Sequence, residues 1–307
     1  MLQVVALALL AIPPHSELVR MFEYDRSAPL DVQEKGVEQR DGVAVHDLSY
    51  ASPGDGRVPA YLVVPPGKGP FAAIVFMHGA GGNRSGMLPQ ALTLAKAGAV
   101  GLLIDAPLSG ARARPGEPIT DVTQPERTRT AMIQNVIDLR RGVDLLTVRP
   151  DVDPHRLGYI GASYGGVIGG VLAGVEKRIN AYALVVGGAS LDDLVRSGTS
   201  PMALRAAKLL TPEQIDHNLE ILAPLDPVHY VGHAAPAALL FQNGRQDKGV
   251  PEASARRYQE AGSEPKRIQW YDAGHGLNTQ AVRDRTEWLH EHLGIDARFR
   301  EDQRPHP

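Results

Sequence analysis

The sequence contains no cysteine, and this absence excludes disulfide bridges, thiolate metal sites and a cysteine nucleophile together. An excess of charge of one sign is also lacking, because 32 Lys and Arg residues stand against 35 Asp and Glu residues, for a net charge of −3. Nothing therefore attracts the chain electrostatically to nucleic acid or to an anionic membrane surface. We expect its partners among small molecules, and the sequence does not indicate an oligomeric state.

Long hydrophobic runs are missing as well. The apolar run at residues 4–12 ends at Pro13 and Pro14 and is too short to span a bilayer, so we expect no stable membrane insertion. Two interpretations of this run remain open. As the remnant of a secretory signal it predicts a secreted or periplasmic protein, although no Lys or Arg precedes it. As an ordinary N-terminal helix packed on the domain, it predicts a cytoplasmic protein.

The composition is that of a globular domain, with 43% hydrophobic and 22% charged residues in a chain of 307. From about residue 45 onward, short β-rich runs alternate with helical patterns, which is typical of a mostly parallel sheet with helices on both faces. The central runs are continuously apolar, as expected of strands buried on both faces. The eight predicted strands are residues 45–50, 58–64, 72–77, 99–104, 157–160, 181–186, 237–242 and 268–271.

No linker or internal repeat divides the chain, so we predict a single α/β domain at residues 45–307, preceded by an N-terminal extension at residues 1–44. The last helix is predicted at residues 279–293. Residues 189–234 are too many for a bare loop in a compact domain, and their helical pattern predicts a small cap-like insertion. This insertion is either a set of surface helices without a role or a lid that shapes a substrate pocket.

The sharpest local signal is Gly161-Ala162-Ser163-Tyr164-Gly165-Gly166, directly after the fifth predicted strand and before a helix of small residues. A serine on a tight strand-to-helix turn needs small neighbours, because a Cβ beside the compressed backbone would clash. Such a turn exposes the hydroxyl above the sheet and directs the N-terminal amides of the following helix at the reaction centre. We therefore predict Ser163 as a nucleophile supported by Gly161 and Gly165. The alternative is a tight turn selected for packing alone.

A serine hydroxyl needs a base before it becomes a good nucleophile. Among the eleven histidines, His275 is placed best, because it lies between two glycines just after the last predicted strand and before the last helix. This position puts it at the same carboxyl edge of the sheet as Ser163. His290 and His292 stand two apart on a predicted helix and face different ways, so they are not a metal pair. We predict no metal site and no cofactor.

The base requires a carboxylate that orients it. In proteins with a serine on this type of turn, the order along the chain is nucleophile, acid and histidine, so the acid lies between Ser163 and His275. We predict Asp247, on the loop after the seventh predicted strand, as this acid. Asp272 is the main rival but lies close to His275 along the chain, and Asp226 belongs to the cap region. The structural alternative for Asp247 is a turn aspartate beside glycine.

The reaction at a serine also needs preorganised backbone donors for the oxyanion. His78-Gly79-Ala80-Gly81-Gly82 follows the third predicted strand, and its glycines let the backbone approach a ligand closely. We predict that the Ala80 N–H acts together with the Tyr164 N–H, with Gly79 in support. His78 is expected to brace this loop by hydrogen bonding rather than to transfer protons. Tyr164 and Met202 are candidates for an acyl pocket, with a core position as the alternative for Met202.

Taken together, these motifs resemble the α/β-hydrolase superfamily. Within it they are similar to the small serine esterases related to dienelactone hydrolases and acetyl xylan esterases, and to the catalytic domains of prolyl-oligopeptidase-like peptidases. The resemblance covers roughly residues 45–295 and implies an α/β-hydrolase fold. The residues that carry it are 78–82, Asp105, 161–166, 225–227, 243–247 and 274–275. For Asp105, after the fourth predicted strand, a structural role is expected.

Two departures from these relatives bear on the substrate. Dienelactone hydrolases use a cysteine nucleophile, which this chain lacks, so that reaction is not expected. Prolyl-oligopeptidase-like peptidases carry a large N-terminal propeller, whereas about 44 residues precede the first predicted strand here. The resemblance to peptidases therefore supports the fold rather than the substrate.

The sequence thus predicts a carboxylic ester hydrolase that acts on a small-molecule ester through an acyl-enzyme on Ser163. Within enzymes, the alternative is an amidase or a short-peptide hydrolase with the same triad. The alternative outside enzymes is a catalytically silent member of the superfamily that binds a small ligand or a partner. Such a protein would be expected to lose a triad residue or the oxyanion glycines. The sequence does not predict the natural substrate or the acyl-chain preference.

Overall fold

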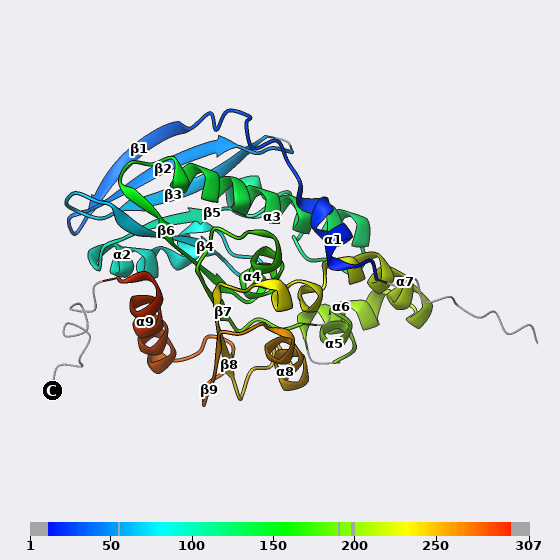
Figure 1. Ribbon diagram of the computed structural model, residues 1–307. Helices are drawn as coiled ribbons and strands as arrows, with labels where there is room; N and C mark the ends of the chain where they lie inside the picture. The colour runs from blue at the N-terminus through cyan, green and yellow to red at the C-terminus, as the bar shows by residue number, and fades with distance from the viewer. Residues whose placement is uncertain (1–11, 55, 190, 198–199, 296–307) are drawn as a thin grey trace, which may run out of the picture.

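The computed structural model describes residues 12–54, 56–189, 191–197 and 200–295 (Figure 1). Within these ranges, nine strands form one sheet in the order β1-β2-β3-β5-β4-β6-β7-β8-β9. The three pairs from β1 to β5 are antiparallel and the five pairs from β5 to β9 are parallel, which confirms the predicted mostly parallel sheet of an α/β-hydrolase fold. The strands are β1 Gln33–Arg40, β2 Val43–Ala51, β3 Arg57–Val64, β4 Phe71–Met77, β5 Ala99–Ile104, β6 Val152–Ala162, β7 Ala181–Val185, β8 Ala238–Gly244 and β9 Lys266–Tyr271.

The edge strand β1 differs from the prediction, because it lies within residues 1–44, which the sequence pattern places outside the sheet. The described part of the sheet therefore has nine strands rather than about eight. All eight residues of β1 are exposed, and the strand pairs with β2 through partners such as Val37 and His46. A strand without a buried face carries no alternation of apolar and polar residues, so the hydrophobic pattern that reveals the other strands is absent from it.

Helices cover both faces of the sheet (Figure 1). Phe76 and Val75 are neighbours on β4 and point to opposite faces, as the period of two in a strand requires. Phe76 is buried in the same cluster as Trp288 of α9, whereas Val75 is buried in the cluster that contains Tyr258 of α8. The helices of these two layers are α2 Leu88–Lys96 and α9 Thr279–Leu293 on one face, and α3 Pro125–Thr147, α4 Tyr164–Val175 and α8 Glu252–Ala261 on the other.

The helix α4 packs unusually close to its neighbours because small residues dominate it. A Cβ at Gly170 would lie 2.0 Å from the hydroxyl oxygen of Tyr258, so only glycine allows this approach. The same hydroxyl donates a hydrogen bond of 2.8 Å to the carbonyl oxygen of Gly166. These contacts hold α4, and the turn at which it begins, against α8.

The chain ahead of β1 packs against α3. It forms two short helices, α1 His15–Leu18 and the 3₁₀ helix η1 Val19–Phe22. Arg140 of α3 donates to the carbonyl oxygen of Phe22 at 2.6 Å, and the Tyr24 hydroxyl donates to Asp144 of α3 at 2.8 Å. Residues 1–11 lie outside the described part of the chain, so both interpretations of the run at residues 4–12 stay predictions. None of the described helices is both long enough and apolar enough to cross a bilayer.

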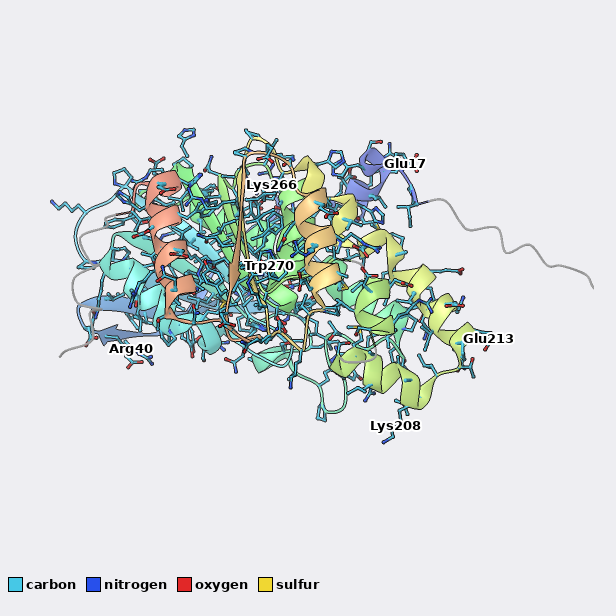
Figure 2. The ribbon with its side chains drawn as sticks, turned by 90° about the horizontal axis from the view of Figure 1, so that it is seen from below. Glu17, Arg40, Lys208, Glu213, Lys266 and Trp270 are labelled. Carbon is cyan, nitrogen blue, oxygen red and sulfur yellow. The ribbon has the colours of Figure 1, made fainter. Side chains whose placement is uncertain are left out.

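The long connection between β7 and β8 begins with three helices, which we call the cap: α5 Leu191–Arg196, α6 Pro201–Leu209 and α7 Pro212–Leu222. Three short 3₁₀ helices then lead to β8, namely η4 Ala223–Leu225, η5 Pro227–His229 and η6 Val231–His233. The helix α7 begins with a capping box, in which Thr211 and Gln214 satisfy each other's backbone N–H groups. In Figure 2, Lys208 and Glu213 of this region lie at the opposite end of the molecule from Arg40 of β1.

Candidate active site

Ser163 lies on the turn between β6 and α4, with φ 55° and ψ −114°. Non-glycine residues rarely adopt such a positive φ, and strained backbone of this kind is concentrated at functional sites. Two hydrogen bonds hold the turn: the Ser163 N–H donates to the Val185 carbonyl at 2.8 Å, and the Ser163 carbonyl accepts from the Val167 N–H at 3.0 Å. The neighbouring strand and the first turn of α4 therefore fix the strained residue from both sides.

The two glycines that flank Ser163 are required by close backbone contacts. A Cβ at Gly161 would lie 2.2 Å from the carbonyl oxygen of Gly165, and a Cβ at Gly165 would lie 2.1 Å from the carbonyl oxygen of Met77. Both distances are far below van der Waals contact, and the opposing atoms belong to the backbone, which cannot turn away as a side chain can. The spacing Gly-x-Ser-x-Gly therefore follows from the way this turn packs against β4 and itself.

His275 lies on the loop between β9 and α9, and its Nε2 is 2.9 Å from the Oγ of Ser163. Its imidazole is 42% exposed, so one side of the ring remains open to solvent. Two contacts hold this loop. The Gln246 N–H donates to the Ala273 carbonyl at 3.0 Å, and the Asn278 side chain caps the start of α9. The histidine is thus held at the carboxyl end of the sheet within hydrogen-bonding distance of the serine.

Asp247, on the loop after β8, faces the other nitrogen of the imidazole. Its two carboxylate oxygens lie 2.9 and 2.8 Å from Nδ1 of His275. The N–H groups of Gly249 and Val250 donate to the same carboxylate at 2.7 and 3.1 Å, and the side chain is 2% exposed. Burial raises the pKa of Asp247, but these hydrogen bonds outweigh burial and hold it below its ordinary value. An ionised Asp247 places the proton of His275 on Nδ1, which leaves Nε2 free to accept from Ser163.

The two other aspartates weighed from the sequence have different partners. Asp272 accepts a hydrogen bond of 2.5 Å from the side chain of Gln246. Asp226 caps η5 and accepts from the backbone N–H of Leu191 at 2.9 Å. Since Asp247 engages Nδ1 of His275 with both of its oxygens, it is the aspartate that the fold brings to the histidine.

The loop after β4 touches the serine. A Cβ at Gly79 would lie 3.3 Å from the Cβ of Ser163. His78 is buried and braces this loop: its Nε2 accepts from the Ala106 N–H at 3.2 Å, so Nδ1 carries the proton and donates to the Gly79 carbonyl at 2.7 Å. Burial lowers the pKa of His78, which keeps the ring neutral in this arrangement. Ala80 follows on the same loop and lines a cavity together with Ser163.

Tyr164 opens α4 immediately after Ser163, and its N–H belongs to the first turn, where a helix leaves its N–H groups without internal partners. The side chain of Tyr164 is buried, and its hydroxyl oxygen accepts a hydrogen bond of 3.2 Å from the Asn135 side chain. Asp105 lies apart from this group. The Asp105 carboxylate accepts hydrogen bonds from the backbone and the side chain of Arg84 at 2.7 and 2.8 Å. It therefore ties the segment between β4 and α2 to the end of β5.

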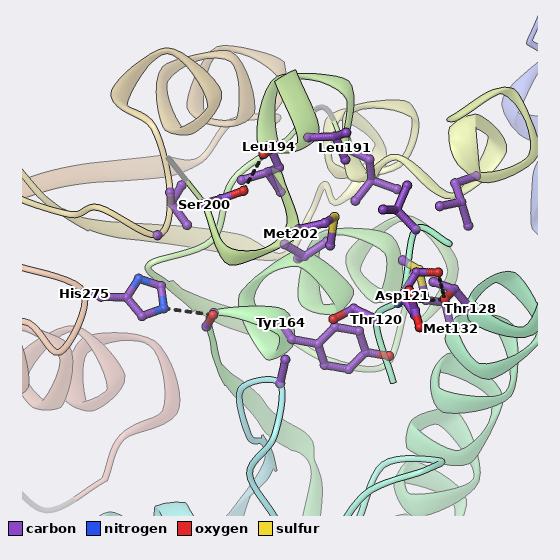
Figure 3. A pocket seen from close by; sticks show the side chains of 18 residues that line it. Thr120, Asp121, Thr128, Met132, Tyr164, Leu191, Leu194, Ser200, Met202 and His275 are labelled. Carbon is purple, nitrogen blue, oxygen red and sulfur yellow. Dashed lines mark hydrogen bonds between the residues drawn. The ribbon is translucent and has the colours of Figure 1, made fainter. Parts of the chain in front are cut away.

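A cavity of about 390 Å³ adjoins Ser163 and His275 and lies under the cap (Figure 3). Tyr164 and Met202, which the sequence proposes for an acyl pocket, both line it. Other lining residues come from α3 and the loop before it, including Val122 and Met132, and sequence reasoning did not find them. Met132 belongs to an apolar helical stripe, and such a stripe indicates core packing unless the position of the cavity is known.

We find no group of three or more His, Asp or Glu side chains arranged to hold a metal ion in the part of the chain that the structure describes. His290 and His292 of α9 have separate backbone partners. His290 Nδ1 contacts the carbonyl oxygen of Ile295, and His292 Nδ1 lies 2.8 Å from that of Trp288.

Comparison with known proteins gives two overlapping family matches. The acetyl xylan esterase family matches residues 16–187, and the prolyl oligopeptidase family matches residues 129–296. Acyl-coenzyme A thioesterase 2, mitochondrial, of Rattus norvegicus is 25% identical over 324 aligned positions, which span 96% of this chain and 68% of that protein.

Solved structures show the same fold. Acetyl xylan esterase 1 from Thermoanaerobacterium sp. superposes with a TM-score of 0.78 at 18% identity, covering 92% of this chain and 95% of that one. Acetyl xylan esterase from Paenibacillus sp. R4 superposes with a TM-score of 0.74 at 20% identity, covering 91% and 92%. Since each family match spans more than half of the 307 residues, the chain belongs to the acetyl xylan esterase and prolyl oligopeptidase families of α/β hydrolases and is a carboxylic ester hydrolase.

Proposed function

We propose that the protein cleaves carboxylic esters through an acyl-enzyme on Ser163, with His275 as general base and Asp247 as the residue that orients it. The observation that carries the proposal is the chain of hydrogen bonds at 2.9 Å from Ser163 to His275 and 2.8 Å from His275 to Asp247, at the mouth of a cavity. A serine becomes nucleophilic when a base takes its proton as it attacks. This arrangement supplies such a base in the required tautomer.

In the first half of the reaction, Oγ of Ser163 attacks the carbonyl carbon while its proton passes to Nε2 of His275. The carbonyl oxygen becomes an oxyanion, and we propose that the backbone N–H groups of Ala80 and Tyr164 stabilise it. The bond from carbon to the leaving oxygen then breaks, and His275 returns its proton to that oxygen, so that an alcohol leaves. Asp247 stabilises the imidazolium that exists between these two proton transfers.

In the second half, water takes the place of the alcohol. His275 removes a proton from the water, whose oxygen attacks the carbonyl carbon of the acyl-enzyme. The bond to Oγ of Ser163 breaks, and Oγ recovers a proton from His275 as the carboxylic acid leaves. The partly open side of the imidazole, 42% exposed, supports this step because water has access to the base.

The experiment that tests the proposal compares wild type with Ser163→Ala in the hydrolysis of p-nitrophenyl butyrate. Loss of the nucleophile should lower kcat by about a thousandfold or more. The matched control is Ser85→Ala, which removes an exposed hydroxyl in the 3₁₀ helix η2 Arg84–Met87 and should leave kcat unchanged. A fluorophosphonate should label the wild type and Ser85→Ala but not Ser163→Ala. Full activity or full labelling of Ser163→Ala would contradict the proposed nucleophile.

Thioester hydrolysis is a second candidate, because the chain aligns over 96% of its length with a protein named as an acyl-coenzyme A thioesterase. The same acyl-enzyme forms from either substrate, and only the leaving group differs. Release of free thiol from an acyl-coenzyme A, measured beside the hydrolysis of the corresponding methyl ester and anilide, separates thioesterase, esterase and amidase activities. A kcat/KM higher for the anilide than for the ester would favour the amidase alternative.

A further inference from the structure

The cavity beside Ser163 extends to one side of the proposed nucleophile. Figure 3 shows His275 at one end of the lining residues and Thr128 and Met132 at the other, with Tyr164 below and Met202 above the space between them. We call the part of the cavity that leads from Ser163 away from His275, toward Thr128 and Met132, the inner arm. Tyr164, Met132, Leu191 and Met202 lie along it in Figure 3, and the lining residues Val122 and Leu222 belong to the same apolar cluster as Leu191.

The position of the inner arm decides which half of an ester enters it. His275 must return its proton to the leaving oxygen, so the alcohol half of the ester has to lie on the His275 side of the carbonyl carbon. The carbonyl oxygen is directed to the loop that carries Ala80. The acyl chain is the remaining substituent, and the space open to it is the arm that leads away from His275.

The surface of the inner arm is suited to an apolar chain. Leu191, Leu222 and Val122 belong to one buried apolar cluster, with Met202 packed against it. The Ser200 hydroxyl, which also lines the cavity, already bonds to protein groups. Ser200 donates to the Leu194 carbonyl, at 2.5 Å, and accepts from the Ala203 N–H at 3.0 Å. An apolar chain therefore gains burial in the arm without leaving the Ser200 hydroxyl unpaired.

At the inner end, the charge of Asp121 is also matched by protein groups. The Asp121 carboxylate is 2% exposed and accepts from Arg127 at 3.2 Å and from Arg205 at 3.2 Å. Thr128 donates to the Asp121 carbonyl at 2.9 Å. The end of the arm thus presents neutralised and hydrogen-bonded groups rather than a site for a charged or hydroxyl-bearing acyl group.

The volume of the cavity bounds the length of the acyl chain from both sides. At about 390 Å³ it lies at the small end of the range of roughly 300–1,000 Å³ found for ligand cavities. An acetyl group places a single methyl beyond the carbonyl carbon and would leave most of this apolar space without an occupant. Because apolar surface that stays unfilled contributes nothing to binding, longer chains should gain transition-state stabilisation that acetate lacks.

We propose that the inner arm is an acyl-binding subsite for straight apolar chains of medium length, and that Met202 on α6 sets the chain length accepted. The inference rests on the proposed acyl transfer at Ser163 and adds to it the substrate class. Met202 qualifies because its flexible, unbranched side chain lies across the arm opposite Tyr164 (Figure 3). It is a specificity-determining residue and takes no part in proton transfer.

Two constitutional isomers test which half of the ester occupies the arm. Methyl heptanoate carries its long chain on the acyl side, whereas hexyl acetate carries it on the alcohol side, and both have the same atoms. We expect the wild type to hydrolyse methyl heptanoate with a kcat/KM at least about tenfold higher than hexyl acetate. Equal values, or a preference for hexyl acetate, would overturn the assignment of the arm to the acyl group.

A variant pair tests the role of Met202. In Met202→Trp, the larger side chain fills the arm, and the ratio of kcat/KM for p-nitrophenyl hexanoate to that for p-nitrophenyl acetate should fall at least about tenfold. The matched control is Leu204→Trp on the same helix, at a position 60% exposed, and it should leave the ratio unchanged. An unchanged ratio in Met202→Trp, or the same fall in Leu204→Trp, would overturn the proposal.

Failure of the inference is distinguishable from failure of the proposed function. If the wild type hydrolyses none of these esters and a fluorophosphonate does not label Ser163, acyl transfer at Ser163 is wrong and the subsite falls with it. If Ser163 is labelled and acetate esters are the best substrates, acyl transfer stands and the subsite is wrong. Should Met202→Trp fail to fold, Met202→Ala widens the arm instead and should move the chain-length optimum toward longer acyl groups.

Discussion

Asp121 and Arg205 join the cap to the body of the protein at the inner end of the cavity. Arg205 of α6 donates to the buried carboxylate of Asp121, which precedes α3, with Nη2–Oδ2 and Nε–Oδ1 distances of 3.2 and 3.3 Å. Burial raises the pKa of Asp121, but hydrogen bonds from Thr123 and Arg205 outweigh burial and hold it below its ordinary value. The carboxylate therefore remains ionised at neutral pH and keeps the position of α6, which carries Met202, fixed over the cavity.

Arg205→Ala should loosen this connection while leaving the fold intact. Because Arg205 is about half exposed, the pair contributes about 0.2–1 kcal/mol, and we expect kcat/KM for p-nitrophenyl hexanoate to fall about two- to fivefold. High salt should act in the same direction on the wild type but less strongly, because the Asp121 carboxylate is 2% exposed and such a pair is screened less than one on the surface. Arg256→Ala is the control, since it removes an exposed pair with Glu252 on α8, away from the cavity lining. Equal effects of the two substitutions would show that the pair does not position α6.

Gly165→Ala tests the packing of the turn that carries Ser163. The added Cβ would meet the Met77 carbonyl oxygen at 2.1 Å, so the backbone must shift. Overpacking of this kind costs about 1–3 kcal/mol of folding free energy. A shift of the turn also displaces Oγ of Ser163 from His275, and we expect kcat to fall about a hundredfold or more. Chemical denaturation and ester hydrolysis measure the two effects separately.

The control for this substitution is Gly86→Ala. A Cβ at Gly86 meets no atom within 4 Å, and the residue has no left-handed backbone conformation. We expect neither stability nor kcat to change by more than the error of measurement. If Gly165→Ala behaved like Gly86→Ala, the turn would be more adaptable than its contacts with β4 indicate.

Asp247→Asn tests the orientation of His275. The asparagine side chain keeps the shape of aspartate but can present an N–H to Nδ1, which favours the wrong tautomer of the histidine. We expect kcat for p-nitrophenyl butyrate to fall by about ten-thousandfold, with little change in folding. Asp272→Asn is the control, because Asp272 bonds to Gln246 and was the rival from the sequence. A larger loss in Asp272→Asn than in Asp247→Asn would reverse the assignment.

The sequence predicted the parallel core of the sheet because those strands are buried on both faces and read as apolar runs. It could not predict β1, whose residues Gln33–Arg40 are all exposed. The hydrogen bonds that hold β1 are made by backbone groups, which every residue except proline supplies. Such a strand is defined by its neighbour β2 rather than by its own side chains.

The candidate site was predictable to the extent that its residues carry local constraints. Ser163 was visible because close backbone contacts require glycine at positions 161 and 165, and His275 because the loop after the last strand ends at the same sheet edge. The inner arm was not visible. Met132 and Leu222 lie far apart in the sequence, and only the packing of the cap on α3 brings them to one cavity.

Asp144 of α3 predicts how stability depends on pH. It accepts hydrogen bonds from Arg178 at 2.6 Å, Tyr24 at 2.8 Å and Arg141 at 3.1 Å, and it is buried. Burial raises the pKa of Asp144, but these donors outweigh burial and hold it below the ordinary value of 3.8. A pKa that is lower in the folded chain than in the unfolded chain stabilises the fold above the unfolded value. That stability is lost as the pH falls through the lower, folded value.

Asp144→Asn should remove this contribution. Because the substitution leaves three cationic or hydroxyl donors around a neutral amide, we expect the free energy of unfolding at neutral pH to fall by about 3–5 kcal/mol. The difference from wild type should shrink once the pH drops below about 3.8, because Asp144 then becomes protonated in the unfolded chain while it is still ionised in the folded chain. Urea denaturation across the pH range measures this difference.

Asp41→Asn is the control. Asp41 makes a surface pair with Lys96, its side chain is 82% exposed, and the pair should contribute at most about 1 kcal/mol. The contradicting result is a constant difference between the free energies of unfolding of Asp144→Asn and wild type from neutral pH into the acid range. That result would show that the ionised carboxylate does not stabilise the contact between α3 and the chain ahead of β1.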